Sequence, residues 1–310
     1  MNLLIPLRTE KRAKLSTEII DENRVSTKLS IRDIAAFCKL RLATLVVMSA
    51  AFCFVLASET VNYSQLLILI VGGFLVTASS NGFNQIIERN LDKLMTRTQN
   101  RPLPSGRMSL NQAYFIAISL GILGIILLWL LINPLSGILG TLALVLYTFV
   151  YTPMKQKTPL AVFIGAFPGA IPPMLGYVAV SGQMSMAAII VFSVQFMWQF
   201  PHFWAIAWVL DDDYKKAGFY LLPSRGGRDK SSAFQVLIYT LCLLPVSLMP
   251  IVFNISGSIA AIIIILCGIG FIAQAIKLYS KCDVKSAQQL MFGSFFYLPI
   301  VQIALMIDKI

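Results

Sequence analysis

The chain has 310 residues, of which 57% are hydrophobic and only 13% are charged, and its mean hydropathy is +0.77. A soluble domain carries about 25% charged residues, so this composition excludes an ordinary soluble protein and predicts a polytopic membrane protein. The net charge of +11 would suit a nucleic-acid binder, but the basic residues are not gathered in one soluble patch. We therefore expect no nucleic-acid partner.

The first 33 residues are polar and mixed in charge, unlike a secretory signal or an acid-poor transit peptide. We interpret residues 1–33 as a flexible cytoplasmic tail and residues 34–310 as one membrane domain. The apolar runs that follow are long enough to span a bilayer. In chain order they begin near Ala35, Leu66, Ala113, Leu135, Pro159, Ser185, Ala233, Ser258 and Ala287. They predict an all-α bundle of about nine transmembrane helices in the lipid bilayer.

The loops between these spans alternate in charge. With a cytoplasmic N-terminus, the inner segments are 1–34, 88–112, 153–158, 211–232 and 277–286, together with Lys39 and Arg41 at the start of the first span. Every Lys and Arg except Lys309 lies in these places. Such a positive-inside bias sets the orientation, and the absence of a transit-like leader favours a bacterial plasma (inner) membrane over an organelle.

The stretch NGFNQIIERNLDKLMTRTQNRPLPSG (81–106) ends the second predicted span with polar side chains spaced four apart. On a helix Asn84, Glu88 and Asp92 form one stripe, because positions four apart differ by only about 40°. The sixth span ends in WVLDDDYKKAGFYLLP, which places the acids of 211–213 at the same membrane level. Either cluster alone could simply finish a helix at the headgroups.

Two features favour a functional reading of these acids. The chain has only 14 Asp and Glu, and acids are unfavourable beside an anionic leaflet unless a cation lies between them. Facing carboxylates with an amide oxygen suit Mg²⁺, which is commonly completed by substrate phosphates. The basic residues at this level that could hold phosphate oxygens are Arg97, Arg101, Arg107, Lys155, Lys157, Lys215 and Lys216. We therefore predict a site for Mg²⁺ and a diphosphate at the cytoplasmic surface.

The only histidine, His202, lies inside the sixth span, where Gln195, Gln199 and His202 share one helical face. Polar groups at this depth usually face a cavity or mark a pathway, and a hydrogen bond to a neighbouring helix is the alternative. The tryptophans of this span leave two readings open, interhelical packing or the wall of a flat apolar ligand; they are Trp198, Trp204 and Trp208.

The fifth span is rich in proline and glycine. Pro168, Pro172 and Pro173 predict a departure from a regular helix, and broken helices can line a cavity. A kinked packing helix is the alternative.

The segment NQIIERNLDKLMTRTQNRPLPSG resembles the first aspartate-rich motif of the intramembrane (UbiA-type) prenyltransferases. Four further strings narrow the resemblance to the protoheme IX farnesyltransferases, or heme O synthases: YTPMKQKTP (151–159), GAFPGAIPPMLGY (165–177), QFPHFWAIA (199–207) and DDYKKAGFYLLP (212–223). The resemblance covers all nine predicted spans but not the first 30 residues.

The resemblance implies a bundle of nine helices around a central cavity. It also implies an enzyme that transfers farnesyl from farnesyl diphosphate to a vinyl group of protoheme IX, with addition of water, to make heme O. Mg²⁺ is the implied cofactor, heme is a substrate rather than a fixed cofactor, and a heme A synthase would act downstream.

The resemblance also implies roles for single residues. Asn84, Glu88 and Asp92 match the first motif and Asp212 and Asp213 the second, so these are the expected metal ligands. Arg97 and Arg101 match basic positions that follow the first motif, and we count them with the acids as catalytic. Residues expected to contact substrate are Lys155, Lys157, Gln195, Trp198, Gln199, His202 and Lys216. The superfamily often has Asp where Gln85 and Glu88 stand, and Leu210 and Asp211 replace a common basic pair, so Asp211 is not assigned as a ligand.

The sequence offers three other functional classes. A quinone-precursor prenyltransferase is the nearest alternative, and the PHFW and DDYKKAG strings argue against it. A transporter would place carboxylates near the bilayer midplane, whereas here they cluster at one surface. A purely structural subunit would not need two acid clusters at one level.

Overall fold

In the computed structural model, residues 29–310 form a bundle of helices without a β-strand. The predicted tail of residues 1–33 lies almost wholly outside this described range and stays a prediction. The helices are α2 (Ile31–Cys38), α3 (Leu40–Ala57), α4 (Tyr63–Asp92), α5 (Leu110–Leu131), α6 (Pro134–Val145), η1 (Leu146–Tyr151), α7 (Thr152–Met154), α8 (Ala161–Ser181), α9 (Met186–Lys216), α10 (Lys230–Val252), α11 (Ser258–Lys281) and α12 (Val284–Ile307).

Within the described part of the chain, nine helices are long and apolar enough to cross a membrane, with α6, η1 and α7 counted as one. This confirms the predicted all-α bundle and a multi-pass integral membrane protein. The first span differs from its predicted start near Ala35, since it begins at Leu40. The chain turns at Lys39, whose φ of 50° and ψ of 56° lie in the left-handed region, and this turn separates the short helix α2 from α3.

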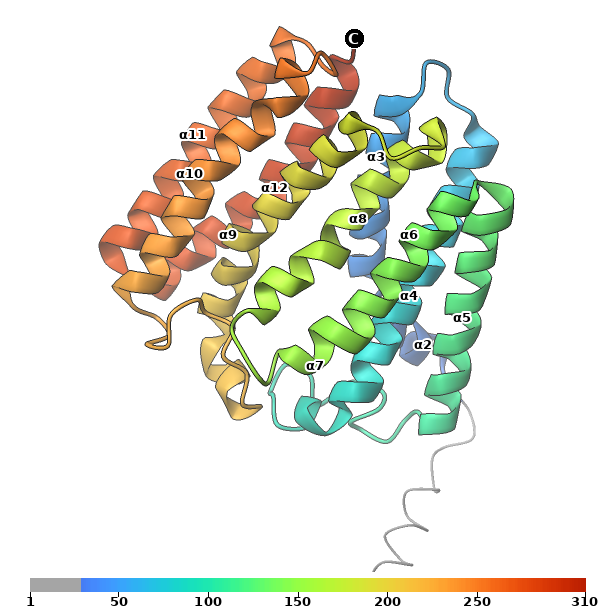
Figure 1. The fold of residues 1–310 in the computed structure, drawn as a ribbon. Coiled ribbons are helices and arrows are strands. Elements are labelled where there is room, and N and C mark those ends of the chain that lie inside the picture. Colours follow the sequence, from blue (N-terminus) through green and yellow to red (C-terminus); the bar gives the residue numbers. More distant parts are fainter. Residues whose placement is uncertain (1–28) are drawn as a thin grey trace, which may run out of the picture.

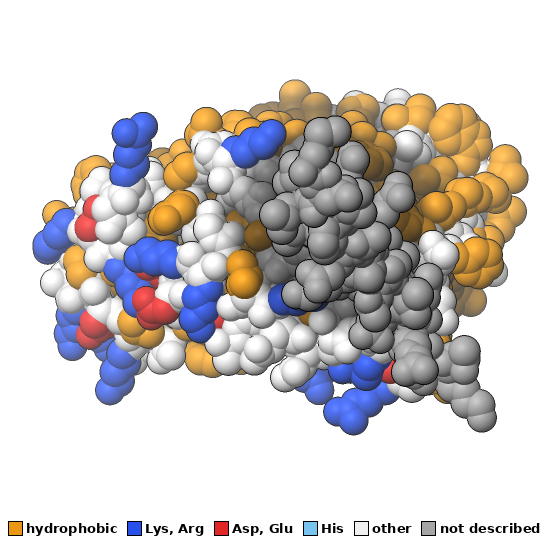
Figure 2. All heavy atoms as spheres, turned by 90° about the horizontal axis from the view of Figure 1, so that it is seen from below, with side chains coloured by type: hydrophobic (Ala, Val, Ile, Leu, Met, Phe, Trp, Pro, Cys, Tyr) orange, Lys and Arg blue, Asp and Glu red, His pale blue; other side chains and the backbone are white. Residues whose placement is uncertain are grey.

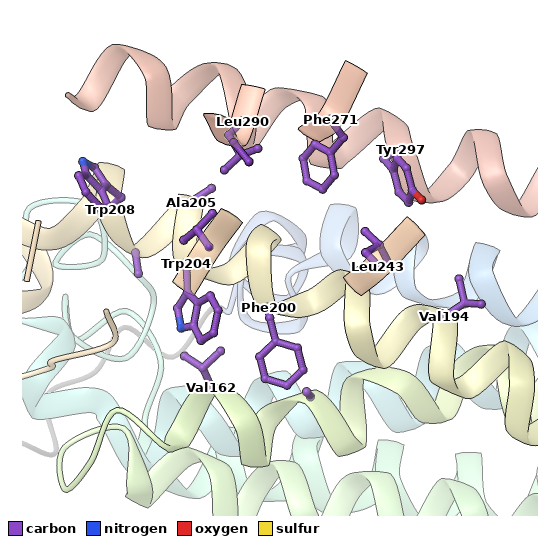
Figure 3. Close-up of a cluster of buried hydrophobic side chains, with 14 of the residues drawn as sticks. Val162, Val194, Phe200, Trp204, Ala205, Trp208, Leu243, Phe271, Leu290 and Tyr297 are labelled. Atoms are coloured by element: carbon purple, nitrogen blue, oxygen red, sulfur yellow. The ribbon is translucent and has the colours of Figure 1, made fainter. Parts of the chain in front are cut away.

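The helices form two groups that meet along two seams (Figure 1). Helices α3 to α8 make one group and α9 to α12 the other, with α8 packed on α9 and α3 packed on α12. The largest hydrophobic cluster is built around α9 and joins the two groups, because it includes Val162 of α8 as well as Phe200, Trp208, Leu243 and Phe271 (Figure 3). Leu91 of α4 packs against this cluster, so both acid-bearing helices, α4 and α9, contact the same core.

Helix α8 corrects one prediction, because it is continuous in spite of its three internal prolines. Pro173 has no N–H to give to the carbonyl of Gly169 four residues earlier. The side-chain amide of Gln195 donates to that carbonyl instead, at 2.7 Å. At Gly176 the helix lies directly against the backbone of α3 at Ala50, where a side chain has no room. The fifth span is therefore a continuous packing helix, and most of it is buried.

Lysine and arginine side chains surround the carboxylates at one end of the bundle (Figure 2). Lys309 is at the opposite end, and its contacts explain this exception to the charge pattern. Its Nζ donates to the carbonyl oxygens of Val55, at 3.2 Å, and Ser58, at 2.5 Å. These carbonyls end α3, where the helix dipole favours a cation.

Candidate active site

The first acidic motif occupies the last turns of α4, which runs for 30 residues and ends at Asp92. Asn84, Glu88 and Asp92 are all buried, each less than 5% exposed. A carboxylate that merely ended a helix at the headgroups would be solvated, and buried charges need partners. The structure therefore agrees with a built polar site rather than a simple helix end.

Each of these three side chains has a basic partner from a different part of the chain. Lys155, just after α7, lies 2.5 Å from the Glu88 carboxylate. Arg101, in the loop after α4, donates to Asp92 Oδ2 at 2.7 Å. Lys39, at the turn between α2 and α3, donates from its Nζ to Asn84 Oδ1 at 2.9 Å. The acid stripe is thus enclosed by three cations.

The two lysines respond differently to this environment. Burial opposes the charge of Lys155, but the Glu88 carboxylate beside it outweighs burial and raises the pKa of Lys155. Burial and the positive charges of Arg101 and Lys155 lower the pKa of Lys39 to about 7. The site holds more positive charge than its own carboxylates balance, which is the electrostatic condition for binding an anion.

A π-helix, η1, shapes the wall next to Lys155. The Lys155 ammonium lies 5.0 Å from the ring centre of Tyr151. Thr152 donates from Oγ1 to the Tyr147 carbonyl five residues earlier, at 2.8 Å, and accepts from Asn84 Nδ2 at 3.4 Å. Single π-turns occur frequently at functional sites. Here the π-helix is followed directly by Thr152, which contacts Asn84 of the acid stripe.

The second acidic motif contacts the loop that follows the first. Asp213, at the end of α9, accepts hydrogen bonds from the backbone amides of Thr96 and Arg97, at 2.8 and 3.2 Å. Lys216 lies 3.1 Å from the same carboxylate and donates to Thr96 Oγ1 at 2.8 Å. Asp213 therefore links the end of α9 to the loop that follows the first motif, at Thr96 and Arg97.

The other two acids of this motif face away from that loop. Asp212 is 78% exposed in its side chain and pairs with Arg228 at 2.9 Å. Asp211 is buried and pairs with Lys215 at 2.7 Å. Asp213 is thus the member of the triplet that contacts the loop after the first motif.

The oxygen donors of the first motif fit a magnesium ion. Asp92 Oδ1 is buried and has no hydrogen-bond partner in the structure, and a carboxylate oxygen is a ligand that Mg²⁺ prefers. Across residues 29–310, no three His, Cys, Asp or Glu side chains are grouped as a ready metal cluster. Remaining ligands would therefore come from substrate phosphates and water, as is usual for Mg²⁺. The predicted ligand role of Asp212 and Asp213 stays a prediction.

His202 faces α12, on the side of α9 that meets the last span. Its Nδ1 lies 2.7 Å from Ser294 Oγ, and that hydroxyl donates to the Met291 carbonyl at 2.6 Å. Since the one hydroxyl proton is used there, Nδ1 is the donor and Nε2 keeps its lone pair. Trp198 stacks on the imidazole, with ring centres 4.2 Å apart, and donates to the Ser294 carbonyl at 3.0 Å. Nδ1 thus makes a hydrogen bond to a neighbouring helix, which is one of the two roles that the sequence predicts for His202.

The two glutamines of the predicted polar face turn to other partners. Gln195 accepts from Ser49 on α3 at 2.6 Å and from Gln302 on α12 at 3.1 Å. Gln199 donates to the Ala166 carbonyl on α8 at 2.9 Å. Their amides thus tie spans together, and their predicted contact with substrate stays a prediction.

The remaining predicted site residues lie outside the acid stripe. Trp204 and Trp208 belong to the packed hydrophobic cluster, which favours the packing alternative for both. Lys157 and the Arg97 side chain are exposed. Arg107 pairs with Asp33 of α2 at 2.9 Å, outside the acid stripe.

Sequence reasoning missed several residues of the site. In the sequence Lys39 is only one more residue of the positive-inside pattern, whereas in the structure it donates to Asn84. Thr152 and Ser294 gave no signal, because hydroxyl residues are common in membrane helices as packing residues. Their roles depend on which helix each one meets.

Comparison with known proteins shows which family this chain is similar to. The model of the UbiA prenyltransferase family matches residues 45–298. The chain is 49% identical to protoheme IX farnesyltransferase of Cytophaga hutchinsonii, over 88% of this chain and 96% of the relative.

Two solved structures share the fold. Digeranylgeranylglyceryl phosphate synthase superposes with a TM-score of 0.75 at 22% identity, over 90% of this chain and 98% of that one. A UbiA homolog from Archaeoglobus fulgidus, bound to GPP and Mg²⁺, superposes with a TM-score of 0.60 at 14% identity, over 88% of this chain and 99% of that one.

Proposed function

The chain belongs to the UbiA prenyltransferase family, and we propose that it transfers a farnesyl group from farnesyl diphosphate to a vinyl group of protoheme IX. With addition of water the product is heme O. The choice of acceptor is supported by the relative from Cytophaga hutchinsonii, whose name is protoheme IX farnesyltransferase and whose length this chain almost fully matches.

The observation that carries the transferase chemistry is the buried acid stripe of α4 with its surrounding cations. A diphosphate is an anion that Arg101 and Lys155 can hold through charge-assisted hydrogen bonds. The same groups stabilise the negative charge that develops on the leaving diphosphate when the bond to the farnesyl C1 carbon breaks. The site thus binds the substrate and favours its ionisation.

Asp92, Glu88 and Asn84 are the residues that would hold Mg²⁺, since Asp92 Oδ1 is buried and unpartnered. When bound, the ion supplies Lewis-acid stabilisation of the diphosphate leaving group. The homolog from Archaeoglobus fulgidus was solved with GPP and Mg²⁺, which supports carrying this metal over to the present chain.

Transfer then needs the acceptor carbon close to farnesyl C1, with water excluded until the new bond has formed. The C1–oxygen bond breaks and its electron pair leaves with the diphosphate. The terminal vinyl carbon of the heme bonds to C1, and a cation forms on the adjacent carbon next to the porphyrin. Water adds there, loses a proton to solvent and leaves a hydroxyl group. No strong protein base is required.

His202 is the residue we assign to heme contact. Its Nδ1 proton is held by Ser294, so Nε2 carries the free lone pair, and an imidazole nitrogen is a common ligand of heme iron. Trp198, stacked on the ring, limits its rotation.

The orientation follows from the charge pattern. We propose a bacterial plasma (inner) membrane, with the N-terminus and the acid stripe on the cytoplasmic side. Heme O made there would be the substrate of a downstream heme A synthase.

The test uses purified protein in detergent with protoheme IX, farnesyl diphosphate and Mg²⁺, followed by mass analysis of extracted hemes. We expect heme O from the wild type and from Asp283→Asn, a matched change at the N-cap of α12, where the side chain accepts from the Ser286 amide. We expect none from Asp92→Asn or after EDTA. Prenylation of an aromatic quinone precursor in place of heme would overturn the acceptor.

A further inference from the structure

The turn between α2 and α3 places a lysine where the backbone favours glycine. Lys39 has φ of 50° and ψ of 56°, and it is one of only three non-glycine residues with positive φ in residues 29–310. A side chain is disfavoured in this conformation, which glycine adopts freely. We therefore expect contacts of the Lys39 side chain to offset the unfavourable backbone conformation.

Amide side chains of α4 hold this turn in place. Gln85 donates from Nε2 to the carbonyl of Phe37 at 2.7 Å, and Asn81 donates to the carbonyl of Cys38 at 3.2 Å. These carbonyls end α2 and have no partner within the helix. Gly82 lies under the ring of Phe37, where a Cβ atom would come 2.7 Å from the ring. The α2–α3 turn is therefore docked on α4 one turn before the acid stripe.

The docked turn delivers the ammonium of Lys39 to the first acidic motif. Its Nζ donates to Asn84 Oδ1 at 2.9 Å. The two carboxylates of the stripe already pair with other cations, Glu88 with Lys155 at 2.5 Å and Asp92 with Arg101 at 2.7 Å. Three cations thus share a site with two carboxylates, and an added anion would offset the excess positive charge.

We propose that Lys39 is a diphosphate-binding residue, held ready by the α2–α3 turn and released from Asn84 when substrate and metal bind. The inference rests on the proposed function, because it takes the acid stripe as the diphosphate site. Lysine is suited to this role, since its flexible stem and three donors let one ammonium move between acceptors. Asn84 Oδ1 would then be free for the metal.

Lys39→Gly provides a sharp test, because glycine keeps the left-handed turn and removes only the cation. Cys282→Gly is the matched control, since Cys282 also has positive φ and lies at the end of α11, in the helix group that does not contain α4. Lys39→Arg restores a charge at the same position. Binding of inorganic pyrophosphate in the presence of Mg²⁺ is measured by titration calorimetry, together with the thermal unfolding midpoint without pyrophosphate.

We expect Lys39→Gly to unfold no earlier than the wild type and to bind pyrophosphate about tenfold more weakly, as for loss of one charge-assisted hydrogen bond. Cys282→Gly should bind as the wild type does, and Lys39→Arg should recover part of the loss. Unchanged binding by Lys39→Gly would overturn the inference, whether or not its unfolding midpoint falls. If wild type fails to bind pyrophosphate, the diphosphate site and the inference both fail. Lys39-dependent binding without heme O formation would support the inference and remove only the proposed acceptor.

Discussion

Replacement of Gly176 by alanine tests the packing of α8 on α3 most directly. A Cβ atom at this position would overlap the carbonyl oxygen of Ala50 and lie 2.8 Å from its carbonyl carbon and 3.0 Å from the Phe54 amide nitrogen. These are backbone atoms of a helix, so no rotamer change can relieve the overlap. The two helices must move apart, and each is packed against the other over much of its length.

The magnitude follows from two opposing effects. Overpacking costs about 1–3 kcal/mol and more where backbone has to shift. Alanine regains about 0.8–1.0 kcal/mol over glycine in a helix. Gly270 of α11 is a matched control, because no atom lies within 4 Å of a Cβ atom built there. We expect Gly176→Ala to lose about 2 kcal/mol relative to wild type, whereas Gly270→Ala should be neutral or slightly stabilised.

The assay is thermal unfolding in detergent, followed by tryptophan fluorescence. At about 2–4 °C per kcal/mol for a chain of this size range, the midpoints of the two variants should differ by about 5 °C or more. Equal midpoints for Gly176→Ala and Gly270→Ala would refute the reasoning, because the close backbone contact between α3 and α8 would then carry no energetic cost.

Three further outcomes follow from single contacts. Asp213→Asn should lower the unfolding midpoint by the equivalent of about 1–2 kcal/mol, because Asp213 accepts two backbone amides, whereas the exposed Asp212→Asn should change it little; equal effects would contradict this. Lys309→Met should cost about 1 kcal/mol through the lost cap of α3, measured in the same way, and an unchanged midpoint would exclude that role. Burial raises the pKa of Asp229, but hydrogen bonds from Ser224 and the first turn of α10 outweigh it and lower the pKa, so this stabilisation is present above the ordinary pKa and lost as pH falls through the lowered one. The destabilisation of Asp229→Ala, about 1 kcal/mol for an N-cap at neutral pH, should therefore shrink in acid, and a pH-independent difference would contradict the assignment.

The location of the spans could be predicted because hydropathy is a local property of the chain. Every predicted span has its helix, and the orientation of the charges is equally local, since loops are short. The one misplaced boundary, at Lys39, depends on a turn that α4 holds from outside through Gln85 and Asn81. No residue within 35–45 predicts this turn, because lysine is an unusual residue for the left-handed backbone conformation.

The fifth span shows a different limit. Proline predicts a broken helix when only the backbone is considered. Helix α8 stays continuous because Gln195, on the next span, replaces the hydrogen bond that Pro173 cannot make. A residue beyond the segment therefore decided its conformation.

Helix periodicity and apolar length are local properties of the chain, so the class of protein, its nine spans and the stripe of Asn84, Glu88 and Asp92 could be predicted. The partners of these residues depend on the packing of the bundle: Lys155 and Lys39 at that stripe, Asp213 on the neighbouring loop, and Ser294 at His202. In a membrane the apolar faces toward lipid and toward protein are chemically alike. The pattern of hydrophobic residues therefore does not reveal which helices meet, and the contacts that build the site depend on how the bundle packs.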